Sequence, residues 1–246
     1  MSQAVPLVSR RGFLPVALAV LLGCGLGCGG DLTLPDASGN GIDLSIVDGR
    51  TQTGVVGEPL PRLVVVKVAT QAGQPIGGRR VAFVLSDPSA GTIDPDTAIT
   101  SSEGQASARW VLGTRPGEYQ GEARLVTTDS TAPPSIPFAA TAHAGPPDTV
   151  RAVSPQNQFG RREHQLDDPL VVAVVDRFGN PVPGAAVHWS VTSGGGSLSA
   201  EETATGSDGT TSVAWTLGPG IGLQRASAAV EGATGSPLTF TATVLF

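Results

Sequence analysis

The sequence of 246 residues predicts an all-β protein, in which two tandem β-sandwich domains follow a signal peptide and a flexible tether. Three observations lead to this fold class. Gly (33 residues) and Pro (20 residues) are abundant, which suits short strands and tight turns better than helices. Apolar side chains alternate with polar ones, which is the period of a half-buried strand. The chain after its leader also repeats itself, which indicates two copies of one structural unit.

Residues 1–23 are predicted to be a signal peptide. Arg10 and Arg11 form a basic start, and an apolar run at residues 13–22 follows them. This run is too short to span a bilayer as a helix and fits the apolar core of a signal peptide. The segment LLGC, which ends at Cys24, resembles a lipobox, where bacterial lipoprotein maturation joins a cysteine thiol to diacylglycerol and cleaves before it. The resemblance implies that Cys24 is the lipidation site.

The leader leaves alternatives open. Cys28 is a second candidate for lipidation, although Gly25 stands where a lipobox usually has an aliphatic residue. A plain signal peptide with two incidental cysteines is a further alternative. Residues 9–14 resemble the twin-arginine export signal, with Arg10 and Arg11 as its arginines. An ordinary Sec signal is the alternative, and either route implies export.

Residues 24–40 are predicted to form the lipidated cysteine and a flexible tether rich in Gly and Pro. Cys24 and Cys28 are the two cysteines of the chain, so the domains that follow contain neither a disulfide nor a Cys-ligated metal. The net charge of −6 would fall to −8 if Arg10 and Arg11 left with the leader. An acidic chain without a basic stripe is not expected to bind nucleic acid.

The duplication follows from matches in the same order along the chain. Trp110 in SSEGQASARWVLG and Trp215 in GSDGTTSVAWTLG occupy equivalent places, 105 positions apart. Residues 63–85 match residues 169–191, and residues 135–142 match residues 237–244. These matches place one domain at residues 41–143 and the other at residues 147–246.

Each copy is expected to hold six to seven strands. Residues 81–85, 187–191 and 213–217 alternate between apolar and other positions and are bounded by Gly, Pro, Asn and Asp. This inventory at roughly 100 residues per copy predicts an immunoglobulin-like sandwich. Because the Cys…Trp…Cys signature of antibody domains is missing, the sheets must pack through aromatic and aliphatic side chains.

These segments resemble the bacterial Ig-like group 1 (Big-1) domains of intimin- and invasin-like surface proteins. The resemblance is carried by QTG at residues 52–54, the turn DRFGNPVPG at residues 176–184 and the block SDGTTSVAWTLG at residues 207–218. In the first copy the turn has changed to TQAGQPIGG at residues 70–78, so the match is looser there. The family implies an extracytoplasmic spacer or adhesion module. No cofactor is expected.

The sequence carries no recognisable catalytic pattern. No nucleophile elbow occurs, and the GGGS segment at residues 194–197 is interpreted as a sandwich turn rather than a phosphate loop. His143, His164 and His188 lack the spacing of a metal pair and are interpreted as solvated surface residues. No enzymatic activity and no metal site are therefore expected.

Four acidic residues in the second copy are candidate calcium ligands: Asp167, Asp168, Asp176 and Asp208. Calcium needs six to eight oxygen ligands from converging segments. We interpret these residues as solvated turn acids, with calcium binding as the alternative.

The sequence predicts a structural or adhesion-type protein, lipid-anchored in the cell envelope at the outer membrane or cell surface. Its predicted partners are the membrane, through Cys24, and a surface protein or glycan. The alternative function is a carbohydrate- or protein-binding module that uses loops of the second domain. Exposed aromatic side chains would favour that alternative, and Phe159 and Phe178 occupy positions that are not expected to face a core.

Overall fold

The computed structural model describes residues 41–127 and 133–245. Within these ranges the fold is built of strands, and its one helical segment is a single 3-10 turn, η1 (Pro88–Ala90). The predicted all-β class is therefore confirmed. No helix in the described part of the chain is long and apolar enough to cross a membrane. The predicted signal peptide with Arg10 and Arg11, the predicted lipidation site Cys24 and the tether lie outside the described residues.

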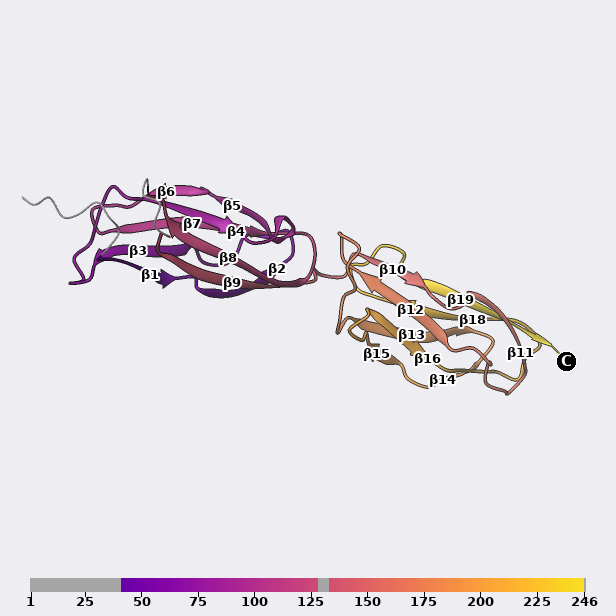
Figure 1. Cartoon of the computed structure of the whole chain (residues 1–246). Coiled ribbons are helices and arrows are strands. Elements are labelled where there is room, and N and C mark those ends of the chain that lie inside the picture. Colours follow the sequence, from indigo (N-terminus) through magenta and orange to yellow (C-terminus); the bar gives the residue numbers. More distant parts are fainter. Residues whose placement is uncertain (1–40, 128–132, 246) are drawn as a thin grey trace, which may run out of the picture. The chain divides into compact units, whose positions relative to one another are not determined.

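The strands of the first copy form two sheets. They are β1 (Ile42–Asp48), β2 (Thr51–Val55), β3 (Val64–Thr70), β4 (Arg80–Leu85), β5 (Gly91–Asp94), β6 (Thr97–Ile99), β7 (Gln105–Leu112), β8 (Gly117–Leu125) and β9 (Ser135–His143). One sheet has the order β1-β3-β7-β5, and the other has the order β2-β9-β8-β4-β6 (Figure 1). Strand β2 runs parallel to β9, and the other pairs formed by the described strands of this copy are antiparallel.

The second copy repeats this arrangement. Its strands are β10 (Thr149–Ala152), β11 (Asn157–Arg161), β12 (Leu170–Val175), β13 (Ala186–Ser193), β14 (Gly196–Leu198), β15 (Glu202–Ala204), β16 (Thr210–Val213), β17 (Trp215–Leu217), β18 (Gly222–Ala229) and β19 (Leu238–Leu245). Three of them form a sheet in the order β10-β12-β16, and β14 pairs with β17. The five-stranded sheet has the order β11-β19-β18-β13-β15, with β11 parallel to β19.

Each copy has its own hydrophobic core, formed by the inward positions of its strands. Trp110, on β7, packs edge to face on Phe138, on β9, with ring centroids 5.4 Å apart and planes at 74°. In the second copy the aromatic pair is Trp189, on β13, and Phe240, on β19, at 6.3 Å. The first pair joins the two sheets of its copy, at a place where antibody domains use a disulfide, whereas the second pair lies within one five-stranded sheet.

A glycine at the same place in both copies lets a strand lie close over the core. A Cβ atom at Gly54, on β2, would lie 2.9 Å from side-chain atoms of Leu60 and Leu112. At Gly160, on β11, it would lie 2.8 Å from Leu166 and 2.7 Å from Leu217. The glycine of the QTG motif is therefore a packing requirement of the sandwich.

The number of strands exceeds the expected six to seven per copy. The short strands β5 and β6, and their counterparts β14 and β15, lie in segments rich in Gly, Pro and polar residues, where alternation over so few positions is not visible. The first strand of each copy is also divided, since β1 pairs with β3 in one sheet and β2 pairs with β9 in the other.

One predicted strand is interrupted in the second copy. The alternating segment at residues 213–217 was expected to form one strand, but it divides at Ala214 into β16, which pairs with β12, and β17, which pairs with β14. The equivalent segment of the first copy is the continuous strand β7. Alternation survives the division, because Val213, Trp215 and Leu217 are all buried.

Candidate functional site

The three histidines lie at separate places on the surface. His143 ends β9 and is exposed, and exposed His164 follows β11 with its Nδ1 atom 2.8 Å from the carbonyl oxygen of Arg162. His188 points away from the core, between buried Val187 and Trp189, and its Nδ1 atom lies 3.5 Å from the carboxylate of Glu202. All three side chains are exposed, which agrees with their interpretation as surface residues.

The four candidate calcium ligands do not form one cluster. No group of three or more His, Cys, Asp or Glu side chains in the described ranges is arranged to hold a metal ion. Asp167 and Asp168 are exposed in the loop before β12. Asp208 accepts hydrogen bonds from the backbone N–H and the hydroxyl group of Thr210, at 3.0 and 2.8 Å, and these bonds lower the pKa of its carboxyl group. Asp208 thus stabilises its own turn.

Asp176 differs from the expected solvated acid, because its side chain is buried. Its carboxylate accepts hydrogen bonds from the backbone N–H groups of Phe178 (2.8 Å), Asn180 (2.9 Å) and Gly145 (2.9 Å), and from the side-chain amide of Asn180 (2.9 Å). Gly145 precedes β10, so one carboxylate joins the turn after β12 to the segment that enters the second copy. The solvated interpretation was wrong for this residue, and the Asp and Asn of the turn motif have a structural role.

The pKa of Asp176 reflects two opposing effects. Burial by itself raises the pKa of this carboxyl group, whereas the Asn180 side chain and the N–H groups of Gly145, Asn180 and Phe178 lower it, and the lowering prevails. The carboxylate therefore remains charged and fully hydrogen-bonded at neutral pH.

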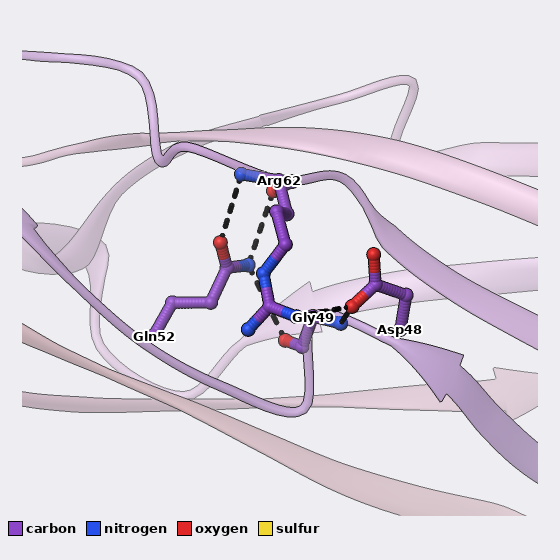
Figure 2. Close-up of polar contacts among 4 residues, drawn as sticks. All are labelled: Asp48, Gly49, Gln52 and Arg62. Carbon is purple, nitrogen blue, oxygen red and sulfur yellow. Dashed lines mark hydrogen bonds and ion pairs between the residues drawn. The ribbon is translucent and has the colours of Figure 1, made fainter.

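A second buried polar side chain, Gln52, stabilises the first copy (Figure 2). Its side-chain oxygen accepts from the backbone N–H of Arg62 at 3.0 Å, and its amide group donates to the carbonyl oxygens of Arg62 (3.1 Å) and Gly49 (3.3 Å). The Arg62 guanidinium pairs with Asp48 at 2.6 Å, where both side chains are exposed. The QTG motif therefore supplies a structural glutamine, which joins the start of β2 to the loop before β3.

The strongest candidate for a binding surface is an exposed sheet face around Phe159. Phe159 is 68% exposed, whereas Phe178, the other aromatic singled out from the sequence, is 39% exposed and has the Arg177 guanidinium 4.7 Å from its ring centroid. Gly160 faces the core, so its neighbours Phe159 and Arg161 point outward from the edge strand β11.

Strand register defines the residues around Phe159. Phe159 lies opposite Thr243, which lies opposite Leu223, so the three form one row across β11, β19 and β18. The neighbouring rows hold Arg161 with Leu245, and Asn157 with Thr241 and Arg225. We call this surface the Phe159 face: Asn157, Phe159, Arg161, Leu223, Arg225, Thr241, Thr243 and Leu245.

The Phe159 face continues into a groove of about 570 Å³ beside β11. Phe159, Arg161 and Leu245 line it from the sheet, and His164, Gln165 and Asp167 line it from the loop before β12. The groove thus places aromatic, basic, acidic and amide groups next to each other at the surface.

The equivalent surface of the first copy has a different chemistry. Register places Thr53, Thr141 and Glu118 where the second copy has Phe159, Thr243 and Leu223. The sequence identified only Phe159 on this face. A comparison of the outward positions of the aligned strands could have found the other residues, since period-two alternation already marks them as outward.

Comparisons with known proteins agree with this fold. The family model of the bacterial Ig-like domain (group 1) matches residues 167–243 of the sequence. No curated protein matches the chain. Among solved structures, the chain is similar to the Escherichia coli adhesin FdeC, with 21% identity and a TM-score of 0.52 over 84% of this chain and 65% of that one.

Two further solved structures are similar to this chain, with lower TM-scores. The Yersinia pseudotuberculosis adhesin InvE has 17% identity and a TM-score of 0.37 over 83% of this chain and 59% of that one. The D0-D1 domain of intimin has 18% identity and a TM-score of 0.32 over 82% of this chain and 96% of that one. The chain spans 59% and 65% of the two adhesin chains, and likeness at such identities concerns the fold alone.

The predicted resemblance is thereby confirmed where it was tightest, because the matched residues include the DRFGNPVPG turn and the SDGTTSVAWTLG block. This match lies within the second copy and shows that residues 167–243 are similar to bacterial Ig-like domains (group 1).

Proposed function

We propose that this protein is an exported lipoprotein, anchored in the cell envelope through Cys24, whose two Ig-like domains act as a structural or adhesion-type module. The observation that carries the proposal is the order of its parts along the chain. A short apolar leader ends at the LLGC segment. Two Ig-like copies follow it, and the second of them matches the bacterial Ig-like domain (group 1). Modules of this fold occur in adhesins such as FdeC, which supports a place outside the cytoplasm.

A lipid at Cys24 would hold the N-terminus of the processed chain at a membrane. Each buried CH₂ group of the acyl chains contributes ~0.8 kcal/mol, and two or more chains give stable attachment without a membrane-spanning helix. We place the anchored protein at the outer membrane or cell surface, with residues 24–40 as the tether.

We further propose that the module consists of two domains, residues 41–143 and 147–246, and has no enzymatic activity. The separate core of each copy supports the division. Within the described ranges, each buried polar side chain hydrogen-bonds to backbone groups, namely Gln52, Thr100, Asp176, Thr205 and Gln224. This use leaves them unavailable for acid–base chemistry.

Lipid labelling tests the anchor. Cells that express the wild-type chain, Cys24→Ala or Cys28→Ala are fed an alkyne-tagged fatty acid and fractionated. We expect labelling and membrane retention of the wild type and of Cys28→Ala, and loss of both for Cys24→Ala. Persistent labelling of Cys24→Ala, with loss for Cys28→Ala, would move the anchor to Cys28. No labelling of any form would refute the lipoprotein proposal.

The export route and the exposed side are tested separately. If the twin-arginine route is used, Arg10→Lys with Arg11→Lys leaves the precursor in the cytoplasm, whereas continued export of this variant indicates the Sec route. Protease treatment of intact cells should degrade a surface-exposed module and spare a periplasmic one.

The second candidate function is a carbohydrate- or protein-binding module in the second copy. The exposure of Phe159 favours it, because an aromatic ring that is 68% exposed on a sheet face contributes little to folding. The sequence predicts that loops form the binding surface. The strand register instead supports a surface on the strands, with a groove beside it.

A further inference from the structure

We propose that the Phe159 face binds an anionic polysaccharide, a glycan chain that carries carboxylate or sulfate groups. This inference rests on the proposed extracytoplasmic function, since such polymers surround cells. It specifies both the surface and the ligand class of the second candidate function. The inference is carried by one aromatic ring, two arginines and three small polar side chains.

The aromatic ring provides an apolar platform. Phe159 is 68% exposed, and Leu223 and Leu245, in its own row and the next, are 49% and 51% exposed. Sugar rings have apolar C–H faces that pack on an aromatic ring, and the flat surface of a sheet lets an extended chain lie across several strands.

The charges of the face select for an anionic ligand. Arg161 and Arg225 are exposed, and none of the outward positions that the structure describes on β11, β18 and β19 holds Asp or Glu. This absence contrasts with the net charge of −6 on the whole chain. Arginine donates paired hydrogen bonds to carboxylate and sulfate-like groups, so two arginines on strands whose outward positions hold no Asp or Glu favour an anion, and Asp167 is the acid of the adjoining groove.

The separation of the two arginines indicates a polymer. Arg161 and Arg225 lie two strands apart and are offset by four residues along the strands. With strands about 4.8 Å apart and a rise of about 3.3 Å per residue, the two side chains start roughly 16 Å from each other. This distance exceeds one sugar ring, so a single chain must extend over several rings to contact both.

The remaining groups suit sugar hydroxyls. Asn157, Thr241 and Thr243 place an amide and two hydroxyl groups beside the arginines, and the Thr241 hydroxyl also donates to the side-chain oxygen of Asn157 at 2.6 Å. His164 and Gln165 line the groove beside Phe159, and Asp167, also in the groove, can accept hydrogen bonds from hydroxyl groups. A bilayer would remove water from these polar groups and from the two arginines, which favours a hydroxyl-rich ligand over a lipid surface.

The first copy is an internal control within the same fold. Its residues at the positions of Phe159, Arg161, Leu223 and Arg225 are Thr53, Val55, Glu118 and Gln120. The scaffold therefore does not require an aromatic residue or an arginine at these places. The residue differences between the two copies at these positions change the chemistry of the surface, whereas the inward positions of both copies are apolar.

Binding of the full-length protein, purified in a non-ionic detergent, tests the proposal. The probes are polygalacturonate and heparin, with neutral dextran and polyglutamate as controls for charge and for sugar. We expect binding to at least one anionic polysaccharide that weakens with added salt, little binding to dextran and weaker binding to polyglutamate. Phe159→Thr, which installs the first-copy residue, should weaken binding roughly tenfold or more.

Matched arginine variants distinguish binding at the Phe159 face from a general effect of positive charge on the protein. Arg161→Gln and Arg225→Gln should each weaken binding, whereas Arg151→Gln, the same change at an exposed position on β10, should not. Thermal melts should coincide with the wild type, because all four side chains point to solvent. Absence of binding to both anionic polysaccharides, equal binding of polyglutamate, or equal losses for Arg151→Gln would each overturn the proposal. These outcomes leave the lipid-labelling test unaffected, so the two proposals fail independently.

Discussion

Buried polar side chains are the residues that specify the turns of this protein. Gln52 and Asp176 use most of their hydrogen-bonding capacity on backbone groups that the strands leave unpaired. A buried donor or acceptor without a partner costs about 1–3 kcal/mol, which makes such side chains hard to replace. The residues that the family motif retains are therefore expected to govern stability rather than ligand binding.

Removal of the Asp176 carboxylate should destabilise the second copy. In Asp176→Ala the N–H groups of Phe178, Asn180 and Gly145 lose their acceptor, and we expect a loss of roughly 3 kcal/mol in the free energy of unfolding. Urea denaturation measures it. Asp168→Ala removes an exposed carboxylate at the other end of β12 and should change stability by less than about 0.5 kcal/mol. Similar losses in the two variants would contradict this role of Asp176.

Asp176 should also make stability depend on pH in the acidic range. Its pKa is lower in the folded state than its ordinary value, so the unfolded state binds more protons in that range. The stabilisation is therefore present above about pH 4 and is lost as pH falls through the folded pKa. Unfolding curves from pH 6 to pH 2 should fall less steeply for Asp176→Asn than for the wild type. Parallel curves would exclude a contribution from this carboxyl group.

Two equivalent tryptophans should respond differently to the same substitution. The indole N–H of Trp110 donates to the carbonyl oxygen of Ala90 at 2.9 Å, whereas that of Trp215 has no acceptor among the described residues. Trp110→Phe loses a buried hydrogen bond that Trp215→Phe does not lose, so it should cost about 1–2 kcal/mol more. Denaturation followed by circular dichroism compares the two, and equal losses would contradict the assignment.

At the scale of strands, the two copies share their register but differ in continuity. Strand β7 pairs with both β3 and β5, whereas its counterpart is divided into β16 and β17, which join different partners. Short edge strands such as β15 form three paired positions, and a central strand such as β12 pairs on both sides. Local stability follows this difference, since edge strands open more readily than central ones.

Hydrogen exchange should reflect that hierarchy. Amide groups of β12 are paired with both β10 and β16 and have mostly buried side chains, so they should exchange much more slowly than those of β15. Exchange followed by mass spectrometry of peptides that cover residues 170–175 and 202–204 measures the difference. Equal or inverted rates would show that β12 is not the stable centre of its sheet.

At the scale of the whole molecule, the residues of each copy form a separate hydrophobic core. One core extends from Leu44 to Ala142 along the chain, and the other from Val150 to Val244. Neither core contains cysteine, because both cysteines of the chain precede residue 29. Stability must therefore come from side-chain burial, which contributes roughly 25 cal/mol per Å² of apolar surface removed from water.

A fragment of residues 144–246 should fold alone. It retains the second core and Gly145, the partner of Asp176 that precedes β10. We expect a cooperative thermal transition and a dispersed amide NMR spectrum, neither of which changes on addition of a reducing agent. A fragment without a cooperative transition would contradict the proposed division into two domains.

The sequence by itself determined the fold class, the duplication and the inward positions of the main strands. Period-two alternation and repeated Gly, Pro and Trp residues are local signals. Phe83, Trp189 and Trp215, at the centres of the alternating segments 81–85, 187–191 and 213–217, are all buried. These signals also marked Phe159 as an outward aromatic, which its exposure confirms.

Only the tertiary structure decided which distant residues meet. The burial of Asp176, the division at Ala214 and the rows that join Phe159 to Leu223 and Arg225 depend on pairing between strands far apart in the sequence. The sequence alone does not distinguish an exposed acidic residue from a buried one, because burial depends on which distant segments pack on the side chain. Strand register places an aromatic ring and two arginines on one face, and alternation alone cannot specify that placement.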